Sequence, residues 1–284
     1  MRVQLLGVRG STPAPGPEFV RYGGHTSCVA VGPDDGPPTL VLDAGTGARR
    51  LSKRLGGAPF RGTVLLSHLH WDHTHGLPFA RALDHPDAEV DLRLPAQTPD
   101  RPAIDVLAGA MGPPHFPITP DGLRGSWNFT TIEPGSFLAG GFTVRAEEIP
   151  HKGGRTYGFR VSDGSNSMAY LSDHGPGALG PGPDGLGERH HGALALADGV
   201  DLLLHDAQHT AAEYPAVAAY GHSSIDYAVD LGRCAGAAEV LLFHHDPNRT
   251  DDELDAIAAA WSTSVEPGVT VAREGDDRVL DRDR

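Results

Sequence analysis

The sequence is poor in cysteine, in aromatic residues and in basic residues. It has only two cysteines, Cys28 and Cys234, among 284 residues, so disulfides cannot form its framework. Both lie in mildly apolar segments, so we expect two buried free thiols, as in a reducing cytoplasm. Lys and Arg number 23 against 37 Asp and Glu, a formal net charge of −14. This balance argues against a large nucleic acid as partner, because phosphate contacts need clustered Lys and Arg.

Long apolar runs are also missing. No stretch approaches the roughly 18 consecutive apolar residues of a transmembrane helix. The first residues, Met1–Gly7, contain no apolar core of signal-peptide length. We therefore expect a cytoplasmic protein with no membrane partner. Gly and Pro are frequent, with 37 and 24 residues, but strand-like segments continue on both sides of the Gly- and Pro-rich stretch 175–187. We therefore expect a single domain over residues 1–284.

Histidine, by contrast, is abundant. The 16 histidines outnumber Phe, Tyr or Trp, and several lie close together in the sequence. Histidine is the commonest metal ligand among side chains and the usual proton shuttle near neutral pH. The composition therefore directs attention to metal binding or acid–base chemistry.

Five short apolar runs each end at a polar residue. They cover 39–42 before Asp43, 63–66 before Ser67, 168–171 before Ser172 and Asp173, 201–204 before His205 and Asp206, and 240–243 before His244. Runs of this length predict buried strands, which need helices outside packed sheets and so indicate an α/β fold. Polar side chains just past several strand ends can converge on one site.

Four helices are predicted, over 46–55, 77–83, 225–235 and 250–261. Ser223 or Ser224 is expected to cap the third. Thr250 and Glu253 form a capping box that opens the fourth.

The strongest motif is Ser67-His68-Leu69-His70-Trp71-Asp72-His73, directly after a predicted strand. It places three imidazoles and one carboxylate within six residues. Alternation puts His68 and His70 on the same side of an extended chain, and a turn after Trp71 can present Asp72 and His73 nearby. Imidazole and carboxylate together suit Zn²⁺, and also Mn²⁺ or Fe.

This motif resembles the signature of the metallo-β-lactamase-fold superfamily of metallohydrolases. The resemblance implies a four-layer αββα sandwich with a dinuclear metal site at one edge, between the two sheets. It also implies four further elements, and the chain offers a candidate for each in the expected order. They are Asp43 as an organising residue, His151 as a third histidine, Asp173 as a bridging carboxylate and His244 as a final histidine.

The resemblance then implies a complete ligand set. The first metal takes His68, His70 and His151; the second takes Asp72, His73 and His244; Asp173 bridges the two. Neighbouring histidines are alternatives: His174 could replace Asp173, although the strand register favours Asp173, and His245 could replace His244. His75 is expected beside the site or at a helix start, and His85, His190 and His191 in solvent. His25 and His115 are candidates for the wall of the cleft.

Further segments resemble the ribonuclease Z and phosphodiesterase branch of the superfamily. They are Tyr157-Gly158-Phe159-Arg160 after His151, His205-Asp206-Ala207, and Gly221-His222-Ser223-Ser224, which has Ser where the branch has Thr. Trp71, His115-Phe116-Pro117 and His244-His245-Asp246-Pro247 resemble a bacterial subgroup of phosphodiesterase-like hydrolases. His25 departs from the usual Asn at its position.

The resemblance implies a hydrolase with two divalent metal ions, Zn²⁺ fitting best. It would cleave a phosphodiester bond of a small molecule or nucleotide with a metal-bridged hydroxide. His222, held by Asp206, would stabilise the developing charge or protonate the leaving oxygen, and Asp72 would assist proton movement. Lys152 and Arg155 either meet a substrate phosphate or lie in a solvated loop.

Three other functions are weighed against this one. The first is a ribonuclease Z that processes the 3′ end of tRNA, against which stand the net charge and the short segment 83–130. The second is an ester, lactone or thioester hydrolase on the same scaffold. The third is a metal-binding scaffold without turnover. The sequence is compatible with a homodimer as well as with a monomer.

Overall fold

Two seven-stranded sheets lie face to face in the computed structural model, which describes residues 1–263 and 266–281. The first sheet has the spatial order β14 (Asp277–Val279), β1 (Arg2–Gly7), β2 (Cys28–Gly32), β3 (Leu40–Leu42), β4 (Arg61–Leu65), β5 (Glu89–Pro95) and β6 (Ser126–Ile132). The second has the order β13 (Gly268–Val271), β12 (Glu239–Phe243), β11 (Leu202–Asp206), β10 (Ser167–Leu171), β9 (Thr156–Ser162), β8 (Phe142–Ile149) and β7 (Gly135–Ala139).

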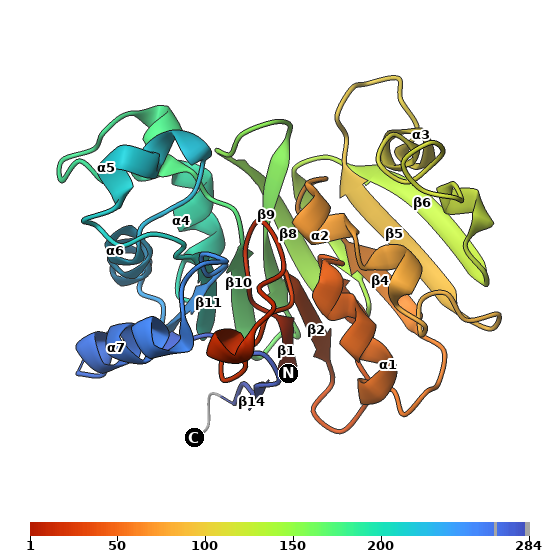
Figure 1. Ribbon diagram of the computed structural model, residues 1–284, viewed down its shortest axis with the longest axis horizontal. Helices are drawn as coiled ribbons and strands as arrows, with labels where there is room; N and C mark the ends of the chain where they lie inside the picture. The colour runs from red at the N-terminus through yellow and green to blue at the C-terminus, as the bar shows by residue number, and fades with distance from the viewer. Residues whose placement is uncertain (264–265, 282–284) are drawn as a thin grey trace.

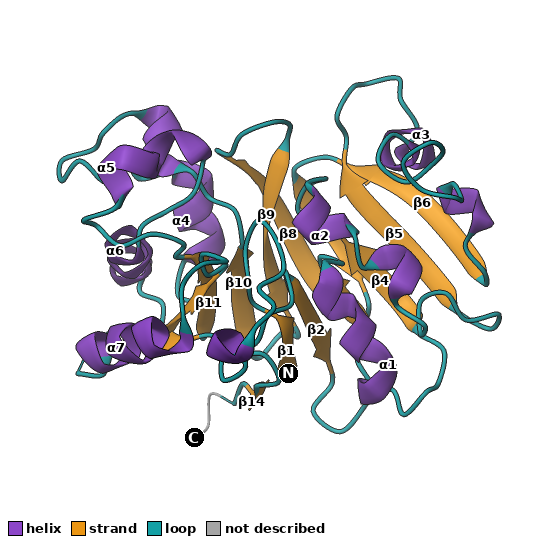
Figure 2. Cartoon of the chain, in the orientation of Figure 1, coloured by secondary structure: helices purple, strands orange, loops and turns teal. Residues whose placement is uncertain are grey.

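Helices cover the outer faces of both sheets (Figures 1 and 2). On one side lie α1 (Leu51–Arg54), α2 (Trp71–Thr74) and α3 (Ala103–Ala108). On the other side lie α4 (His191–Ala197), α5 (Tyr214–Val217), α6 (Ile225–Ala235) and α7 (Asp251–Trp261). Single 3₁₀ turns occupy Pro17–Phe19, Thr46–Arg50, Leu77–Phe79, Pro120–Gly122, Pro176–Leu179 and Ala218–Tyr220.

The buried apolar residues form three layers that match this arrangement. A central cluster joins the facing sheets, with Leu42 of β3 and Phe243 of β12 among its members. A second cluster lies between the second sheet and α4, α6 and α7, and a third between the first sheet and the helices around α1 and α3. The chain is therefore a four-layer αββα sandwich, which confirms the predicted fold.

Parallel pairing explains why polar strand ends meet at one edge. Strands β3, β4 and β5 run parallel in the first sheet, and β10, β11 and β12 run parallel in the second. All five predicted strand segments are present, and the carboxyl ends of parallel strands lie on the same edge of a sheet. Asp43, His68, Asp173, Asp206 and His244 follow or end these strands.

The helix predictions meet with mixed success. Helices α6 and α7 occupy the expected residues, with Ser224 accepting a hydrogen bond from Tyr227 and the capping box of Thr250 and Glu253 fully formed. The segment 46–55 divides into a 3₁₀ turn and the short α1.

The helix expected over 77–83 is wrong. Only the 3₁₀ turn Leu77–Phe79 forms, because Ala80 leaves helical geometry for an extended conformation. The helical turn α2 begins instead at Trp71, inside the histidine-rich motif 67–73. Gly76 follows it, and a Cβ there would lie 1.9 Å from the carbonyl oxygen of Gly45, so a side chain has no room.

The cysteine prediction is half right. Cys28 is buried on β2, whereas Cys234 is exposed on α6. Its position on the outer side of an amphipathic helix explains the difference, because the apolar neighbours in the sequence face the sheet. Among the described residues, no helix combines the length and the apolar character needed to cross a membrane.

Candidate metal centre

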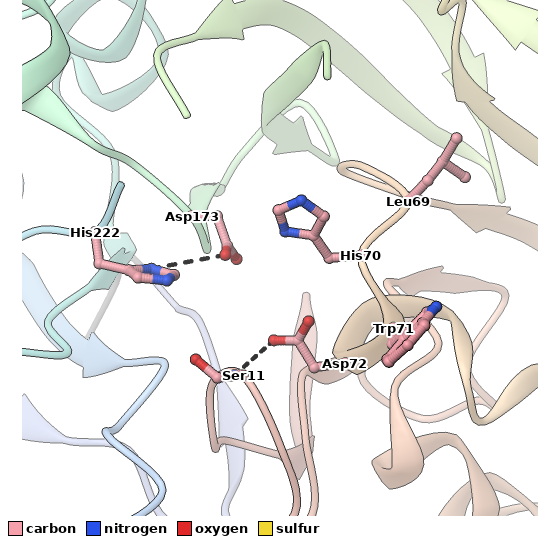
Figure 3. Close-up of a pocket in the computed structure, with 7 residues that line it drawn as sticks. All are labelled: Ser11, Leu69, His70, Trp71, Asp72, Asp173 and His222. Atoms are coloured by element: carbon pink, nitrogen blue, oxygen red, sulfur yellow. Dashed lines mark hydrogen bonds and ion pairs between the residues drawn. The ribbon is translucent and has the colours of Figure 1, made fainter. Parts of the chain in front are cut away.

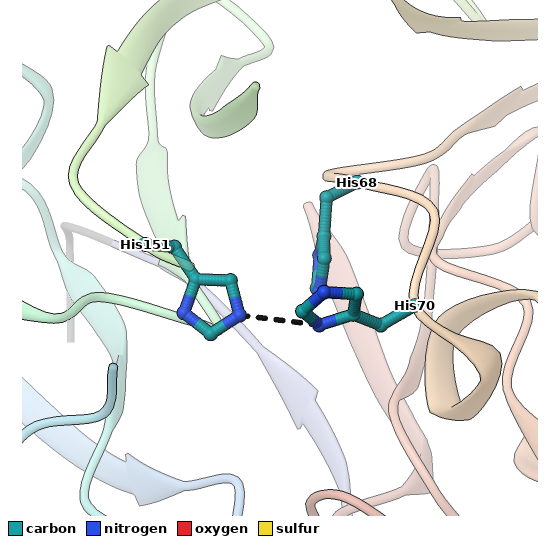
Figure 4. A group of neighbouring side chains, drawn as sticks. All are labelled: His68, His70 and His151. Atoms are coloured by element: carbon teal, nitrogen blue, oxygen red, sulfur yellow. Dashed lines mark hydrogen bonds between the residues drawn. The ribbon is translucent and has the colours of Figure 1, made fainter. Parts of the chain in front are cut away.

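Three histidines converge at the edge between the two sheets (Figure 4). His68 and His70 lie in the loop between β4 and α2, and His151 lies in the loop between β8 and β9. One ring nitrogen from each lies within 4.8 Å of the others. Nε2 of His151 is 3.2 Å from Nδ1 of His70, and the buried Nε2 of His68 has no hydrogen-bond partner among the described residues. Converging nitrogens with an unpartnered member suit a cation.

A second group of ligand atoms lies beside this histidine group. It consists of Asp72, His73, Asp173 and His244, all buried, with one ligand atom from each within 4.8 Å of the others. Nε2 of His73 is 3.2 Å from Asp72 Oδ2, and Nε2 of His244 is also 3.2 Å from that oxygen. We call these residues the carboxylate group, and His68, His70 and His151 the histidine group.

Asp173 connects the two groups through its separate oxygens. Its Oδ1 lies 3.8 Å from Nε2 of His68 and 3.5 Å from Nε2 of His151. Its Oδ2 lies 3.0 Å from Nε2 of His73 and 3.3 Å from Nε2 of His244. A carboxylate with one oxygen on each side is the geometry expected of a ligand that bridges two cations.

The neighbouring histidines point elsewhere. Nδ1 of His174 lies 3.0 Å from Nε2 of His205, away from the ligand groups. Nε2 of His245 donates to the carbonyl oxygen of Ala272 at 2.8 Å. Of the alternatives left open by the sequence, the geometry therefore favours Asp173 and His244.

Asp43 holds His73 of the carboxylate group in position through a hydrogen bond. This fully buried carboxylate accepts hydrogen bonds from Nδ1 of His73 at 2.7 Å, from Ser67 and from the hydroxyl of Tyr170. Because the bond to Asp43 fixes the proton on Nδ1 of His73, the opposite nitrogen is left as a ligand. The carbonyl oxygen of Gly221 holds Nδ1 of His151 in the same way, at 2.6 Å.

Backbone strain is concentrated at this site. Three non-glycine residues have a left-handed backbone in the described chain: Ser11 at φ 62°, Asp43 at φ 58° and His244 at φ 59°. Such conformations are unfavourable for residues with a Cβ and persist where the surrounding structure enforces them, often at active sites. Gly10 lies against the same site, since a Cβ there would be 2.3 Å from Nδ1 of His244.

The electrostatics differ between the two groups. Burial lowers the pKa of His68, His70 and His151, which keeps these rings neutral and able to bind a cation. Burial alone would raise the pKa of Asp173, but the adjacent His244 and His73 hold the pKa well below its usual range. The Asp173 carboxylate is therefore ionised and ready to receive positive charge.

A cavity of about 350 Å³ opens onto the two groups (Figure 3). His70, Asp72, Asp173 and His222 point toward its centre, whereas Leu69 and Trp71 lie to one side. Ser11 closes another side, and its amide donates to Oδ2 of Asp72 at 2.7 Å. The site can thus hold a small ligand in contact with both ligand groups.

His222 stands at the edge of this cavity beside Asp206. Its Nδ1 is 2.8 Å from Oδ2 of Asp206, at the end of β11, and 3.7 Å from Oδ1 of Asp173. Burial alone would lower the pKa of His222, but the Asp206 carboxylate outweighs it and raises the pKa to about 9. With Nδ1 paired, Nε2 of His222 remains as a donor.

The chain matches the family model of the beta-lactamase superfamily domain over residues 39–245. It belongs to the beta-lactamase superfamily. A ribonuclease Z of Natronomonas pharaonis is 23% identical, over 95% of this chain and 97% of that protein. Family and fold thus confirm the resemblance seen in the sequence motifs.

Solved structures of this superfamily have the same architecture. The metallo-beta-lactamase fold protein YhfI from Bacillus subtilis is 20% identical, with a TM-score of 0.68 over 98% of both chains. A diphosphatase from the PhnP family is 17% identical, with a TM-score of 0.71 over 99% of this chain and 98% of that one.

Other residues singled out in the sequence lie outside the ligand groups. Lys152 donates to the carbonyl oxygen of Ala219, and Arg155 pairs with Glu133 and Glu148, so both are engaged within the protein. This favours a place in the solvated loop for both side chains over contact with a substrate phosphate.

The remaining histidines have separate environments. His25 bonds to Glu274, His75 stacks on the indole of Trp71, and His115 lines a neighbouring groove with Phe116. His85 and His190 are half-buried rather than solvated, and His190 caps α4, whereas His191 is exposed.

Two contributors to the site were missed in the sequence. Ser11 lies in the segment 7–13, which resembles the Gly-rich opening of the branch, but the sequence gave it no role of its own. Tyr170 bonds to Asp43 from the other sheet, 127 residues away, and only its place in a strand that ends at Asp173 could have suggested a role.

Proposed function

We propose that this protein is a dinuclear metal-dependent hydrolase that cleaves small phosphodiesters. The observation that carries the proposal is the Asp173 carboxylate, with one oxygen toward each ligand group. The similarity to proteins named as a ribonuclease Z and a diphosphatase supports a phosphorus–oxygen bond as the target. The cavity volume of about 350 Å³ and the acidic balance of the chain support a small substrate.

The nitrogen and carboxylate donors fit two divalent cations. We assign His68, His70 and His151 to one ion, and Asp72, His73 and His244 to the other, with Asp173 shared. Mixed imidazole and carboxylate ligands favour Zn²⁺, with Mn²⁺ or Fe as alternatives. When bound, such ions supply Lewis-acid stabilisation of phosphoryl oxygens and lower the pKa of a bound water.

His222 has the role of proton donor in this proposal. Asp206 fixes its Nδ1, so Nε2 can give a hydrogen bond or a proton to the leaving oxygen or to the charged phosphoryl group. Asp72, which contacts two histidines and the amide of Ser11, is placed to assist proton movement. The buried free thiol of Cys28 supports a reducing, cytoplasmic location. We also propose that residues 1–284 form a single domain.

A ribonuclease Z activity on precursor tRNA is the second candidate. The similarity to the Natronomonas pharaonis protein over nearly the whole chain favours it. The formal net charge of −14 disfavours it, because tRNA binding relies on basic side chains.

A substrate panel with metal analysis of the same preparation separates the candidates. We expect two transition-metal ions per chain and hydrolysis of bis(4-nitrophenyl) phosphate, with little turnover of a thioester, a lactone or precursor tRNA. His222→Asn should keep both ions and lower kcat on the diester by about 10²- to 10⁴-fold. Full activity after stringent chelation, or turnover of only the thioester or lactone, would contradict the proposal; cleavage of precursor tRNA alone would favour the second candidate.

A further inference from the structure

A groove of about 490 Å³ lies beside the metal centre, between α2 and the loop that follows α3. Residues of the segment 71–79 form one wall, and residues of the segment 107–116 form the other. Trp71 belongs to the wall of this groove and also to the wall of the cavity at the metal centre. A molecule held at the metal centre can therefore extend past Trp71 into the groove.

Aromatic rings of both walls are open to solvent. Trp71 is 67% exposed and Phe79 is 58% exposed. The ring of His75 stacks on that of Trp71, with 5.5 Å between the centroids and 15° between the planes. From the other wall, the ring of Phe116 meets that of Phe79 edge to face, with 5.8 Å between the centroids. Large apolar side chains that are exposed together mark a binding surface.

The polarity of the walls restricts what the groove can take. Among the described residues that line it there is no Asp, Glu, Lys or Arg, and most are apolar or glycine. The hydroxyl of Thr74 donates to the carbonyl oxygen of His70 at 3.1 Å, so only His75 and His115 offer further polar side chains. A charged or strongly hydrogen-bonding group finds few partners there, whereas a flat apolar group can stack on the exposed rings.

Trp71 and His222 lie on opposite sides of the cavity at the metal centre, with Asp72 and Asp173 between them (Figure 3). The proposed function places the leaving oxygen beside His222. The other ester group, which stays on phosphorus during hydrolysis, is then directed to the side of Trp71. The groove is therefore placed to bind the retained ester group of the substrate.

We propose that this groove binds an uncharged, apolar ring system on the retained ester group, while the phosphodiester lies at the metal centre. The ring system contacts the exposed indole of Trp71 and the rings of Phe79 and Phe116. These residues then determine specificity for an apolar ester group over a polar nucleoside. This inference rests on the proposed phosphodiesterase function and adds the class of the retained group.

Three chromogenic diesters with the same 4-nitrophenolate leaving group test the inference. Their retained ester groups are 2-naphthylmethyl, methyl and 5′-thymidyl. We expect kcat/KM to be at least about tenfold higher for the naphthylmethyl ester than for either of the others, because even one methylene group in an apolar pocket changes kcat/KM by about tenfold or more.

Substitutions in both walls should remove this preference. Phe79→Ala and Phe116→Ala take away a ring, and Ala110→Phe fills the groove with a new one. Each should bring the ratio of the naphthylmethyl ester to the methyl ester toward one, mainly through KM for the naphthylmethyl ester. Phe79 and Ala110 are exposed, so these two variants test the groove even if Phe116→Ala folds poorly.

Leu138→Ala is the matched control. Leu138 is an apolar residue of β7 that is 71% exposed, and it lines neither the groove nor the cavity at the metal centre. This variant should keep the wild-type ratio. Metal content and thermal unfolding of every variant show whether the centre is intact.

Binding of the monoester products gives a second readout that does not depend on turnover. Isothermal titration of the metal-loaded protein should show 2-naphthylmethyl phosphate binding at least about tenfold more tightly than methyl phosphate. Most of this difference should be lost in Phe79→Ala and kept in Leu138→Ala. Equal affinities of the wild-type protein for the two monoesters would contradict an apolar site in the groove.

The outcomes separate this inference from the function on which it rests. Equal turnover of the naphthylmethyl and methyl esters, a preference for the thymidine ester, or a ratio unchanged in Phe79→Ala and Phe116→Ala would overturn the inference and leave the phosphodiesterase standing. A dimer that Phe79→Ala converts to monomers, with the ratio unchanged, would make the groove an interface between two copies and would also overturn it. Failure to hydrolyse any of the three esters or bis(4-nitrophenyl) phosphate would overturn both.

Discussion

The two ligand groups of the metal centre are built differently, although they share Asp173. The histidine group offers neutral imidazoles, and one of its members, His70, is only half-buried. The carboxylate group is buried throughout and contains the ionised Asp72. Asp43 supports it from beneath, and His244 within it has a strained backbone.

This difference predicts that the two groups hold their cations with different affinities. A cation in the carboxylate group is surrounded by more negative charge and less solvent, so the attraction is stronger there. A cation in the histidine group lies nearer solvent and can exchange more readily. We therefore expect a tightly held ion beside a weaker one, with Asp173 joining the two.

The largest effect is expected from the shared ligand. Asp173→Ala removes one oxygen from each side of the centre and takes the neighbouring carboxylate from His68 and His151. We expect loss of both ions at micromolar metal and a fall in phosphodiester kcat/KM well beyond the 10- to 100-fold typical of supporting residues. Metal analysis after gel filtration and steady-state kinetics measure this. Retention of two ions would contradict a bridging role.

A matched pair of substitutions should separate the groups. His68→Ala removes a ligand of the histidine group, and His244→Ala removes one of the carboxylate group. Each should lower the content from two ions to about one and abolish phosphodiester hydrolysis, since the chemistry uses both ions. His68→Ala should keep the tightly bound ion, whereas the ion left in His244→Ala should be easily chelated. The same residual affinity in both variants would remove the distinction between the groups.

A smaller effect is expected from Asp43, which bonds to His73 of the carboxylate group. Asp43→Asn takes a charged acceptor from Nδ1 of His73 and should weaken the tighter site by about 10- to 100-fold. Isothermal titration with Zn²⁺ measures each site. Tyr170→Phe removes only one of the donors to Asp43 and serves as the milder comparison. An equal loss in both sites, or none, would disagree with the assigned role of Asp43.

The smallest effect is expected from Gly10, which lies against the ring of His244. Gly10→Ala places a Cβ 2.3 Å from Nδ1 of His244, so the ring must move. The affinity of the carboxylate group should fall by about tenfold or less, with the histidine group unchanged. Gly268→Ala is the control, because a Cβ there meets nothing nearer than 3.7 Å. Identical metal binding in the two variants would show that the ring tolerates the crowding.

The sequence predicted the first members of both ligand groups, and the strand framework, for a physical reason. His68, His70, Asp72 and His73 are close in sequence, so one local motif defines their chemistry. The short apolar runs locate the strands, and polar residues at their ends meet because parallel strands finish at one edge.

Features that depend on contacts between distant segments could not be predicted. The strain at Ser11 and His244 arises from surrounding structure, and the bond from Tyr170 to Asp43 crosses between the sheets. The helix expected over 77–83 fails for a similar reason, since Ala80 turns extended and the backbone of Ala82 bonds to Phe60 and Ser52 instead.

Stepwise chelation of the fully loaded protein, with metal analysis at each step, tests the central claim most directly. We expect two ions per chain that leave at separate chelator concentrations. The first ion to leave should be the one already missing in His68→Ala. A single ion at saturation, or two ions that leave together at one chelator concentration, would contradict a centre made of two unequal groups joined by Asp173.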